Sequence, residues 1–295
     1  MNEVIVIAGP TGVGKTKLSI SLAKELNGEI INCDSMQIYK GLDIGTAKVT
    51  KEEMENIPHH LINIKEVNEE YSIYNYQKDA RNKIEEILSR NKTPILVGGT
   101  GLYIKAALYD YNLNEENDKN LYEDKTTEEL YNELLKLDKK AKSIDKNNRR
   151  RIINAINYYN NNNKSITENK TDKILYNVKF IGLTTERSNL YNIINKRVDE
   201  MINNGLIDEV KKFHDQNIYT KPLTAGIGYK EIYKYLDNII TKEEAIEEIK
   251  KNSRHYAKRQ YTFFNNQLNI KWFETNYNDF NKTINEVVNY IKEGK

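Results

Sequence analysis

The sequence has little cysteine and tryptophan and no long apolar run. Its 295 residues include one Cys and one Trp, and only 38% of them are hydrophobic. Because the lone Cys33 has no second cysteine to pair with in the chain, a disulfide-stapled secreted fold is excluded. The apolar run at residues 4–8 is too short for a signal sequence or a membrane span. We therefore expect a cytoplasmic protein without a membrane partner.

A large excess of charge of one sign is also absent. The 45 Lys and Arg residues nearly balance the 43 Asp and Glu residues, which leaves a formal net charge of +2. This balance excludes a uniformly basic nucleic-acid coat, although a local basic face would not appear in the sum. No tandem repeat is visible, so we expect the 295 residues to hold one substantial core and a smaller lobe.

Short apolar runs alternate with amphipathic segments along the chain. The run at residues 4–8 predicts a strand buried on both faces of a parallel sheet, and a helix over 15–26 and a strand over 29–34 complete a βαβ unit. Further strands are expected at residues 94–99, 178–183 and 270–273, and further helices at residues 76–88, 190–215, 229–236, 243–265 and 280–291. This order predicts an α/β fold with a parallel sheet.

Residues 9–16 match the phosphate-loop pattern G-x-x-x-x-G-K-S/T directly after the first strand. Glycines let the backbone N–H groups and the following helix N-terminus point at a phosphate chain, and Lys15 adds a full charge. We expect the Thr16 hydroxyl to join the coordination of a phosphate-bound Mg²⁺ ion. The predicted phosphate-binding residues are Gly9, Thr11, Gly12, Val13, Gly14, Lys15 and Thr16. A kinase, an ATPase and an enzyme that expels diphosphate would all need this loop.

The phosphate loop and the order of elements predict a P-loop NTPase-like three-layer α/β/α core with an inserted helical domain. The insertion is indicated at residues 112–172, where the composition becomes polar and helices are expected near 127–137 and 149–159. The strand pattern returns at residue 178, so residues 1–111 and 173–295 are expected to form two parts of one core, the second with basic helices.

A long motif follows the second predicted strand, at the sheet edge where α/β folds bind ligands. Residues 34–48 read D-S-M-Q-I-Y-K-G-L-D-I-G-T-A-K. This segment resembles the tRNA dimethylallyltransferases (tRNA isopentenyltransferases), and further motifs of that family are matched at residues 58–61, 71–72, 97–103, 197–199, 205–206, 228–231 and 257–260. The resemblance implies transfer of a dimethylallyl group from dimethylallyl diphosphate to N6 of adenine 37, in the anticodon stem-loop of tRNAs that read codons beginning with U.

Asp34 is the candidate general base, because the weakly nucleophilic adenine amine must lose a proton as the new bond forms. A carboxylate at a strand end is alternatively an indirect Mg²⁺ partner or a helix cap. The resemblance implies that Thr100, beyond the neighbouring strand, helps hold the adenine or Asp34, unless it only caps the following helix. Gln37 could bind an adenine edge or stabilise its own loop. Ser35 and Met36 are included by resemblance among the residues expected to bind tRNA.

Basic side chains on two predicted helices are candidates for RNA phosphate contacts. Arg150 and Arg151 begin a helix of the insertion, which we therefore expect to contact tRNA. Arg254, Lys258 and Arg259 lie on the helix of the A-K-R-Q motif. The alternative is that these charges only form solvated helix faces.

Two arginines of the family pattern are replaced, by Ala225 and Asn265, so we expect Lys230 and Arg254 to assist Lys15 in binding diphosphate. Three alternatives stay open: an adenylate-type isopentenyltransferase that uses free adenine nucleotides, a P-loop small-molecule kinase, and a non-catalytic RNA-binding module. The insertion and the basic helix favour RNA over a free nucleotide. We expect the protein to work as a monomer.

Overall fold

The computed structural model describes residues 3–111, 113, 122–168 and 173–293. These residues form a six-stranded sheet in the order β3-β2-β4-β1-β5-β6, and every paired neighbour is parallel. The strands are β1 (Glu3–Ala8), β2 (Gly28–Asn32), β3 (His59–His60), β4 (Thr93–Gly98), β5 (Asn177–Thr184) and β6 (Lys271–Glu274). The predicted α/β fold with a parallel sheet is confirmed.

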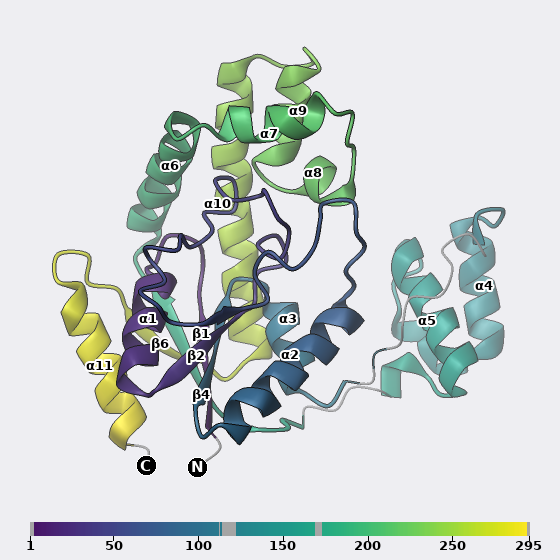
Figure 1. Ribbon diagram of the computed structural model, residues 1–295. Helices are drawn as coiled ribbons and strands as arrows, with labels where there is room; N and C mark the ends of the chain where they lie inside the picture. The colour runs from purple at the N-terminus through teal and green to yellow at the C-terminus, as the bar shows by residue number, and fades with distance from the viewer. Residues whose placement is uncertain (1–2, 112, 114–121, 169–172, 294–295) are drawn as a thin grey trace. The chain divides into compact units, whose positions relative to one another are not determined.

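The helices follow the predicted pattern with a few differences (Figure 1). They are α1 (Lys15–Glu25), α2 (Ile73–Ser89), α3 (Gly101–Leu108), α4 (Thr127–Leu137), α5 (Arg149–Asn162), α6 (Arg187–Asn203), α7 (Leu206–His214), α8 (Lys221–Ala225), α9 (Tyr229–Leu236), α10 (Lys242–Gln267) and α11 (Phe280–Glu293). The prediction of a single helix over 190–215 is wrong. The helix is interrupted at Gly205, whose φ of 96° is not helical, and the segment forms two helices, α6 and α7. The second strand ends at Asn32, so Asp34 lies in the turn beyond it.

The described chain divides into two compact units. The larger, residues 3–70, 79–104 and 176–293, contains the sheet and a core in which β1, β4 and β5 pack against α1, α6 and α11. Strand β1 is buried almost throughout, which explains why residues 4–8 are continuously apolar rather than alternating. In this unit α10 runs beside α6 and α9 (Figure 1).

The smaller unit comprises residues 71–78 and the described part of 105–175. Helices α4 and α5 bury a separate apolar cluster that includes Leu130, Leu134, Ile152 and Ile156. Thr126 caps α4: its hydroxyl accepts the Glu129 N–H, and the Glu129 carboxylate accepts the Thr126 N–H. The boundaries predicted for the insertion, residues 112 and 172, lie outside the described residues.

No helix in the described ranges is both long enough and apolar enough to cross a membrane.

A buried carboxylate at the amino end of β2 joins β3 to the turn between α2 and β4. Glu29, which is 1% exposed, accepts two hydrogen bonds from the Arg90 guanidinium at 2.6 and 2.9 Å and one from Lys92 at 2.8 Å. His60 of β3 lies 2.7 Å from the same carboxylate. The bidentate contact with Arg90 is the largest cause that lowers the pKa of Glu29 from 4.5 to about 2.

We expect Glu29→Gln to lower the free energy of unfolding by about 2 kcal/mol at neutral pH, because it leaves this cluster without its anion. The lowered pKa means that the carboxylate stabilises the fold above pH 4.5 and loses this effect as the pH falls toward 2. Denaturant unfolding at several pH values would measure the difference. Glu86→Gln is the control, because this exposed carboxylate also contacts Arg90, at 3.4 Å, and its removal should change little.

Candidate active site

The phosphate loop joins β1 to α1, as predicted. Gly9, Gly12 and Gly14 have φ values of 145°, 88° and 89°, which other residues rarely adopt. A Cβ atom on Gly9 would lie 2.7 Å from the Leu183 carbonyl oxygen, so β5 also packs too closely for a side chain there. Val13 is fully buried and can reach a ligand only through its backbone, whereas Thr11 is half-buried and Thr16 is exposed. The glycines therefore set the backbone conformation of the loop, and the loop packs against the core through Gly9 and Val13.

The amine of Lys15 lies over its own loop. It donates hydrogen bonds to the carbonyl oxygens of Gly9 at 2.9 Å and Pro10 at 2.6 Å. The pKa of Lys15 is lowered to about 7, mainly by burial and next by the charge of Arg197, while the charge of Asp34 opposes the shift. Because the surroundings of Lys15 disfavour its charged form, a bound anion would stabilise that form.

Arg197 belongs to α6, and its charge acts on Lys15 while that of Asp34 acts on it. Burial lowers its pKa, and the charges of Asp34, Glu200 and Glu53 oppose the shift, with Asp34 the largest of the three. None of these carboxylates forms an ion pair with Arg197 within the described residues. Arg197 belongs to the family motif at residues 197–199, but the sequence alone predicts no role for it. Its position beside Lys15 depends on how α6 packs, which no local pattern predicts.

Asp34 and Thr100 lie together because β2 and β4 are parallel neighbours, with Asn32 paired to Val97. The Asp34 N–H donates to the Asn32 side chain at 3.0 Å, and one carboxylate oxygen of Asp34 accepts the Met36 N–H at 2.9 Å. The other carboxylate oxygen has no hydrogen-bond partner among the described residues. Asp34 is thus held by its backbone and one oxygen, which leaves the second oxygen for a substrate.

Thr100 holds the turn that carries Asp34. Its hydroxyl oxygen accepts the Ser35 N–H at 3.2 Å, and its own N–H donates to the Cys33 carbonyl at 3.1 Å. The amide of Gln37 donates to the Thr46 carbonyl at 3.1 Å, which is the loop-stabilising role considered above. Binding of adenine by Gln37 stays a prediction.

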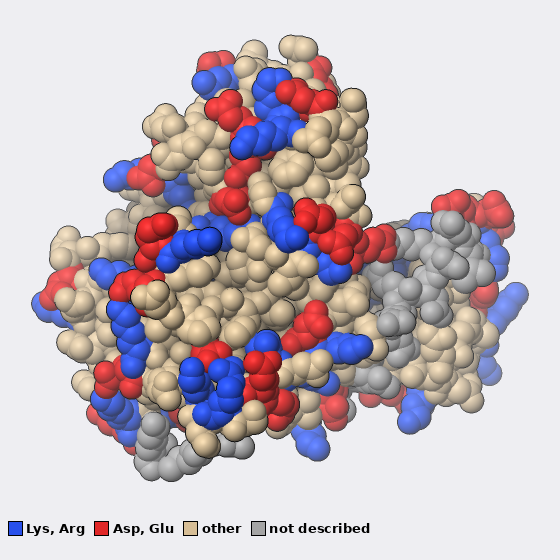
Figure 2. All heavy atoms as spheres, viewed as in Figure 1, with Lys and Arg blue, Asp and Glu red and all other residues tan. Residues whose placement is uncertain are grey.

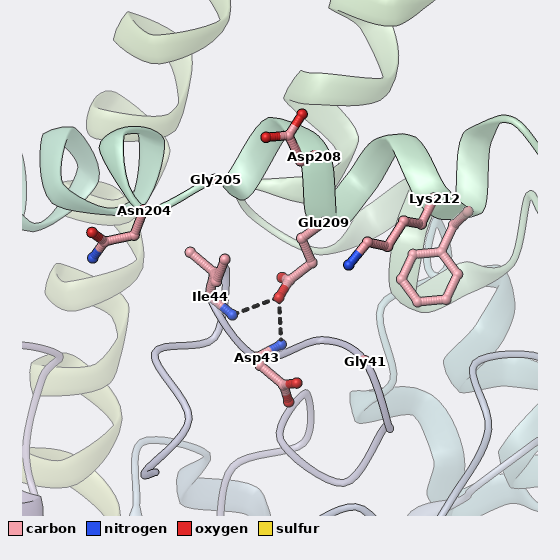
Figure 3. Close-up of a pocket in the computed structure, with 9 residues that line it drawn as sticks. Gly41, Asp43, Ile44, Asn204, Gly205, Asp208, Glu209 and Lys212 are labelled. Atoms are coloured by element: carbon pink, nitrogen blue, oxygen red, sulfur yellow. Dashed lines mark hydrogen bonds between the residues drawn. The ribbon is translucent and has the colours of Figure 1, made fainter.

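A single carboxylate anchors the middle of the motif segment (Figure 3). Glu209 of α7 accepts the backbone N–H groups of Asp43, Ile44 and Gly45 at 2.9, 2.7 and 3.0 Å. The Tyr229 hydroxyl donates to the same carboxylate at 2.7 Å, and its ring occupies the space that a Cβ on Gly45 would need. Glu209 is 7% exposed, so it makes few hydrogen bonds to water. Its hydrogen bonds to these N–H groups and to the Tyr229 hydroxyl replace the ones to water that burial removes.

A cavity of about 400 Å³ lies beside Glu209, between α7 and the same loop (Figure 3). It is lined by Gly41, Asp43, Ile44, Asn204, Gly205, Asp208, Glu209, Lys212 and Phe213. None of these residues belongs to the predicted phosphate-binding or catalytic set. The cavity therefore lies outside the site built from the phosphate loop, Asp34 and Thr100.

A family model described as IPP transferase matches residues 37–267 of this chain. The chain belongs to the IPP transferase family. The tRNA dimethylallyltransferase of Anoxybacillus flavithermus is 50% identical over 302 residues, which cover 99% of this chain and 97% of that relative. The tRNA dimethylallyltransferase of Bacillus subtilis is 46% identical over 283 residues, covering 92% of this chain and 90% of the relative.

Solved structures agree with this assignment to the IPP transferases. The full-length tRNA isopentenylpyrophosphate transferase of Bacillus halodurans is 46% identical, with a TM-score of 0.77 over 99% of this chain and 96% of that chain. A eukaryotic dimethylallyltransferase acting on tRNA is 33% identical, with a TM-score of 0.81 over 92% of this chain and 73% of that chain. The P-loop-like fold predicted from the phosphate loop is therefore the fold of the family.

The cations predicted to assist Lys15 have protein partners in this IPP transferase. Lys230 lies 3.5 Å from the Glu231 carboxylate, and Arg254 donates to the Asn195 side chain at 2.5 Å. Asn265, which replaces a family arginine, accepts a hydrogen bond from the Trp272 ring at 3.0 Å. Arg197 is instead the cation that shares the electrostatic environment of Lys15 and Asp34.

Four of the five basic residues predicted to contact RNA are exposed, whereas Arg254 is half-buried. Lys258 and Arg259 are exposed on α10, and Arg150 and Arg151 are exposed at the start of α5. Arg149 has a structural role, because its guanidinium donates to the carbonyls of residues 122 and 125 at 2.6 Å. Basic and acidic side chains are interspersed over the face in Figure 2, consistent with the small net charge.

We expect the protein to take up a proton when an alkyl diphosphate binds near pH 8. With a pKa of about 7, Lys15 is then largely neutral in the free protein, and the bound anion favours its charged form. Calorimetry in two buffers of different ionisation enthalpy would measure an uptake approaching about one proton. The uptake should shrink below pH 7 and be lost in Lys15→Met; equal uptake by Lys15→Met and the wild type would contradict the assignment.

Proposed function

We propose that this protein transfers a dimethylallyl group from dimethylallyl diphosphate to N6 of adenine 37 in tRNAs that read codons beginning with U. The observation that supports this most is the meeting of the phosphate loop, two cations and Asp34 at one edge of the sheet. Acceptors such as a free adenine nucleotide or a kinase substrate are not favoured, because the relatives matched over nearly the whole chain are named for tRNA.

The diphosphate of the donor would bind the loop N–H groups, the Lys15 ammonium and the Arg197 guanidinium. In the reaction the donor C–O bond breaks, the new C–N bond forms, and the electron pair of the broken bond leaves with the diphosphate. Cations and oriented N–H groups stabilise that departing charge, and their positions are set before the reaction. The low pKa of Lys15 and the unpaired Arg197 both indicate a site that lacks this negative charge.

The exposed Thr16 hydroxyl at the start of α1 fits a Mg²⁺ ion held mainly by diphosphate oxygens. No cluster of three His, Cys, Asp or Glu side chains able to hold a metal occurs in the described part of the chain, which agrees with an ion that arrives with the donor. When bound, the ion would neutralise phosphate charge. Lys15, Arg197 and the loop supply the remaining positive charge.

Asp34 would accept the N6 proton of adenine as the C–N bond forms. Its second carboxylate oxygen is available for this step, while Thr100 holds the neighbouring backbone and Gln37 lies in the following loop. The adenine must leave the base stack of the anticodon loop to reach a carboxylate at the sheet edge. Ser35 and Met36 belong to the same turn and would contact the displaced base.

We also propose that residues 112–172 and the basic face of α10 bind tRNA phosphates, and that the protein works as a monomer. The exposure of Arg150, Arg151, Lys258 and Arg259 supports the first statement. A tRNA substrate together with the lone Cys33 supports the expected cytoplasmic location.

Asp34→Asn should reduce single-turnover transfer from labelled dimethylallyl diphosphate to unmodified tRNA by roughly two to four orders of magnitude, because it removes the base but keeps the side-chain size. The dissociation constants for tRNA and donor should change little. AMP and ATP are added as competing acceptors, and Asp208→Asn, which alters an exposed carboxylate, is the control. Preferential labelling of AMP or ATP would contradict the proposed acceptor, and near-normal transfer by Asp34→Asn would remove its role as base.

Removing Arg150 and Arg151 together should weaken tRNA binding and flatten the slope of log affinity against log salt, since each lost phosphate contact releases about one counterion fewer. Donor binding should be unchanged. The matched control is Lys271→Gln with Lys282→Gln, two exposed cations of the larger unit. The same slope for both double variants would mean that the arginines form only a solvated face.

A further inference from the structure

The phosphate loop receives a hydrogen bond from a residue near the other end of the chain. The Thr275 hydroxyl donates to the Val13 carbonyl oxygen at 2.9 Å, and Thr275 is 4% exposed. Thr275 directly follows β6, 262 residues after Val13 in the sequence. Residues 9–14 form neither a strand nor a helix, so regular backbone pairing does not hold this turn. The bond from Thr275 is therefore a tertiary support of an irregular segment.

Thr275 is itself fixed by the sheet. Its N–H donates to the Thr184 carbonyl at 2.9 Å, which continues the pairing of β6 with the end of β5. Threonine is branched at Cβ, so its side chain has few rotamers and the hydroxyl has few positions. The sheet thus holds the hydroxyl in place, and the hydroxyl in turn holds the loop.

The direction of the Val13 carbonyl sets the direction of the next N–H group. The peptide between Val13 and Gly14 is trans, as are all peptides in the described ranges. In a planar trans peptide the C=O and N–H bonds point in opposite directions. Because Thr275 holds the carbonyl, the N–H of Gly14 must point away from Thr275. Gly14 is one of the residues predicted to bind phosphate.

A ring from the start of α11 packs against the same glycine. A Cβ atom on Gly14 would lie 2.5 Å from Cε2 of Phe280, and the φ of Gly14 is 89°. The Lys17 amine lies 5.0 Å from the centroid of the Phe280 ring. Helix α11 runs beside α1 (Figure 1). The segment from Thr275 to Phe280 thus contacts the loop at two successive residues, Val13 and Gly14.

A role of Thr275 in stability alone would differ from a role in positioning in its effect on ligand binding. If the bond only pairs two buried polar groups, its loss lowers the free energy of unfolding and leaves binding by the folded protein unchanged. If the bond also orients the peptide of Gly14, its loss weakens phosphate binding by a protein that is still folded.

We propose that Thr275 is a positioning residue that orients the Gly14 N–H of the phosphate loop by holding the Val13 carbonyl. The proposal rests on the proposed function in one respect, which is that the loop binds the diphosphate of the donor. N–H groups stabilise a departing diphosphate best when their positions are set before the reaction. With Thr275 in place, the Gly14 N–H needs no reorientation when the diphosphate binds.

Calorimetry with inorganic diphosphate and Mg²⁺ tests this role. Thr275→Val removes the hydroxyl but keeps the shape, and we expect it to weaken binding by about threefold to tenfold. Thr275→Ser keeps the hydroxyl and should bind nearly as tightly as the wild type. Thr93→Val is the matched control, because the Thr93 hydroxyl at the start of β4 likewise donates to a backbone carbonyl, that of Leu26 at 3.1 Å.

The control should lose stability but bind diphosphate like the wild type. Equal affinity of Thr275→Val and the wild type would overturn the proposal. Equal losses of affinity in Thr275→Val and Thr93→Val would also overturn it, because binding would then follow general stability. The same loss in Thr275→Ser as in Thr275→Val would show that the hydroxyl is not the group responsible.

Steady-state kinetics separates the donor from the acceptor. Thr275→Val should lower kcat/KM for dimethylallyl diphosphate by about threefold to tenfold and leave the KM for tRNA unchanged, because the Gly14 N–H faces only the diphosphate. An unchanged kcat/KM for the donor, or an equal change in the KM for tRNA, would contradict the positioning role.

Hydrogen exchange in the protein without substrates distinguishes a failure of this inference from a failure of the proposed function. Thr275→Val should speed amide exchange in residues 12–16, whereas Thr93→Val should not. If exchange and diphosphate binding change as expected but the wild type does not modify tRNA, the proposed function fails and the role of Thr275 stands. If the wild type modifies tRNA and exchange in residues 12–16 is the same in all variants, the role of Thr275 is refuted and the proposed function stands.

Discussion

The site depends on an unbalanced set of charges held in a partly desolvated place. Two basic side chains, Lys15 and Arg197, share the environment of the single carboxylate of Asp34, and burial lowers the pKa of both. A diphosphate would supply the missing negative charge. Its attraction to the basic groups would then offset the cost of their desolvation.

The remaining contacts keep a long irregular segment in place around those charges. Residues 33–48 form no strand or helix, so their backbone groups must find partners elsewhere. Glu209 accepts three backbone N–H groups of this segment, and Thr100 binds on both sides of Asp34. Each support comes from a different part of the chain, and together they give a loop the precision usually found on rigid elements.

Two arginines of the family pattern are absent from this chain. Ala225 and Asn265 stand where those side chains are expected, and Asn265 pairs with Trp272. The cationic partner of Lys15 is Arg197, which belongs to a motif that this chain retains. In the proposed site, Arg197 of α6 would supply positive charge independently of the two positions that changed.

The sequence by itself determined the parallel sheet, the phosphate loop and the placement of Asp34 and Thr100, because these follow from local patterns: buried apolar runs, glycines before Lys15, and polar residues at strand ends. Only the tertiary structure decided the positions of Arg197 and Glu209. Glu209 meets Gly45 across 164 residues of chain and Gln260 meets Gly99 across 161. Such contacts depend on how helices pack over the sheet edge. The periodicity of side chains within one helix shows which face is buried, but it does not predict which distant loop that face contacts.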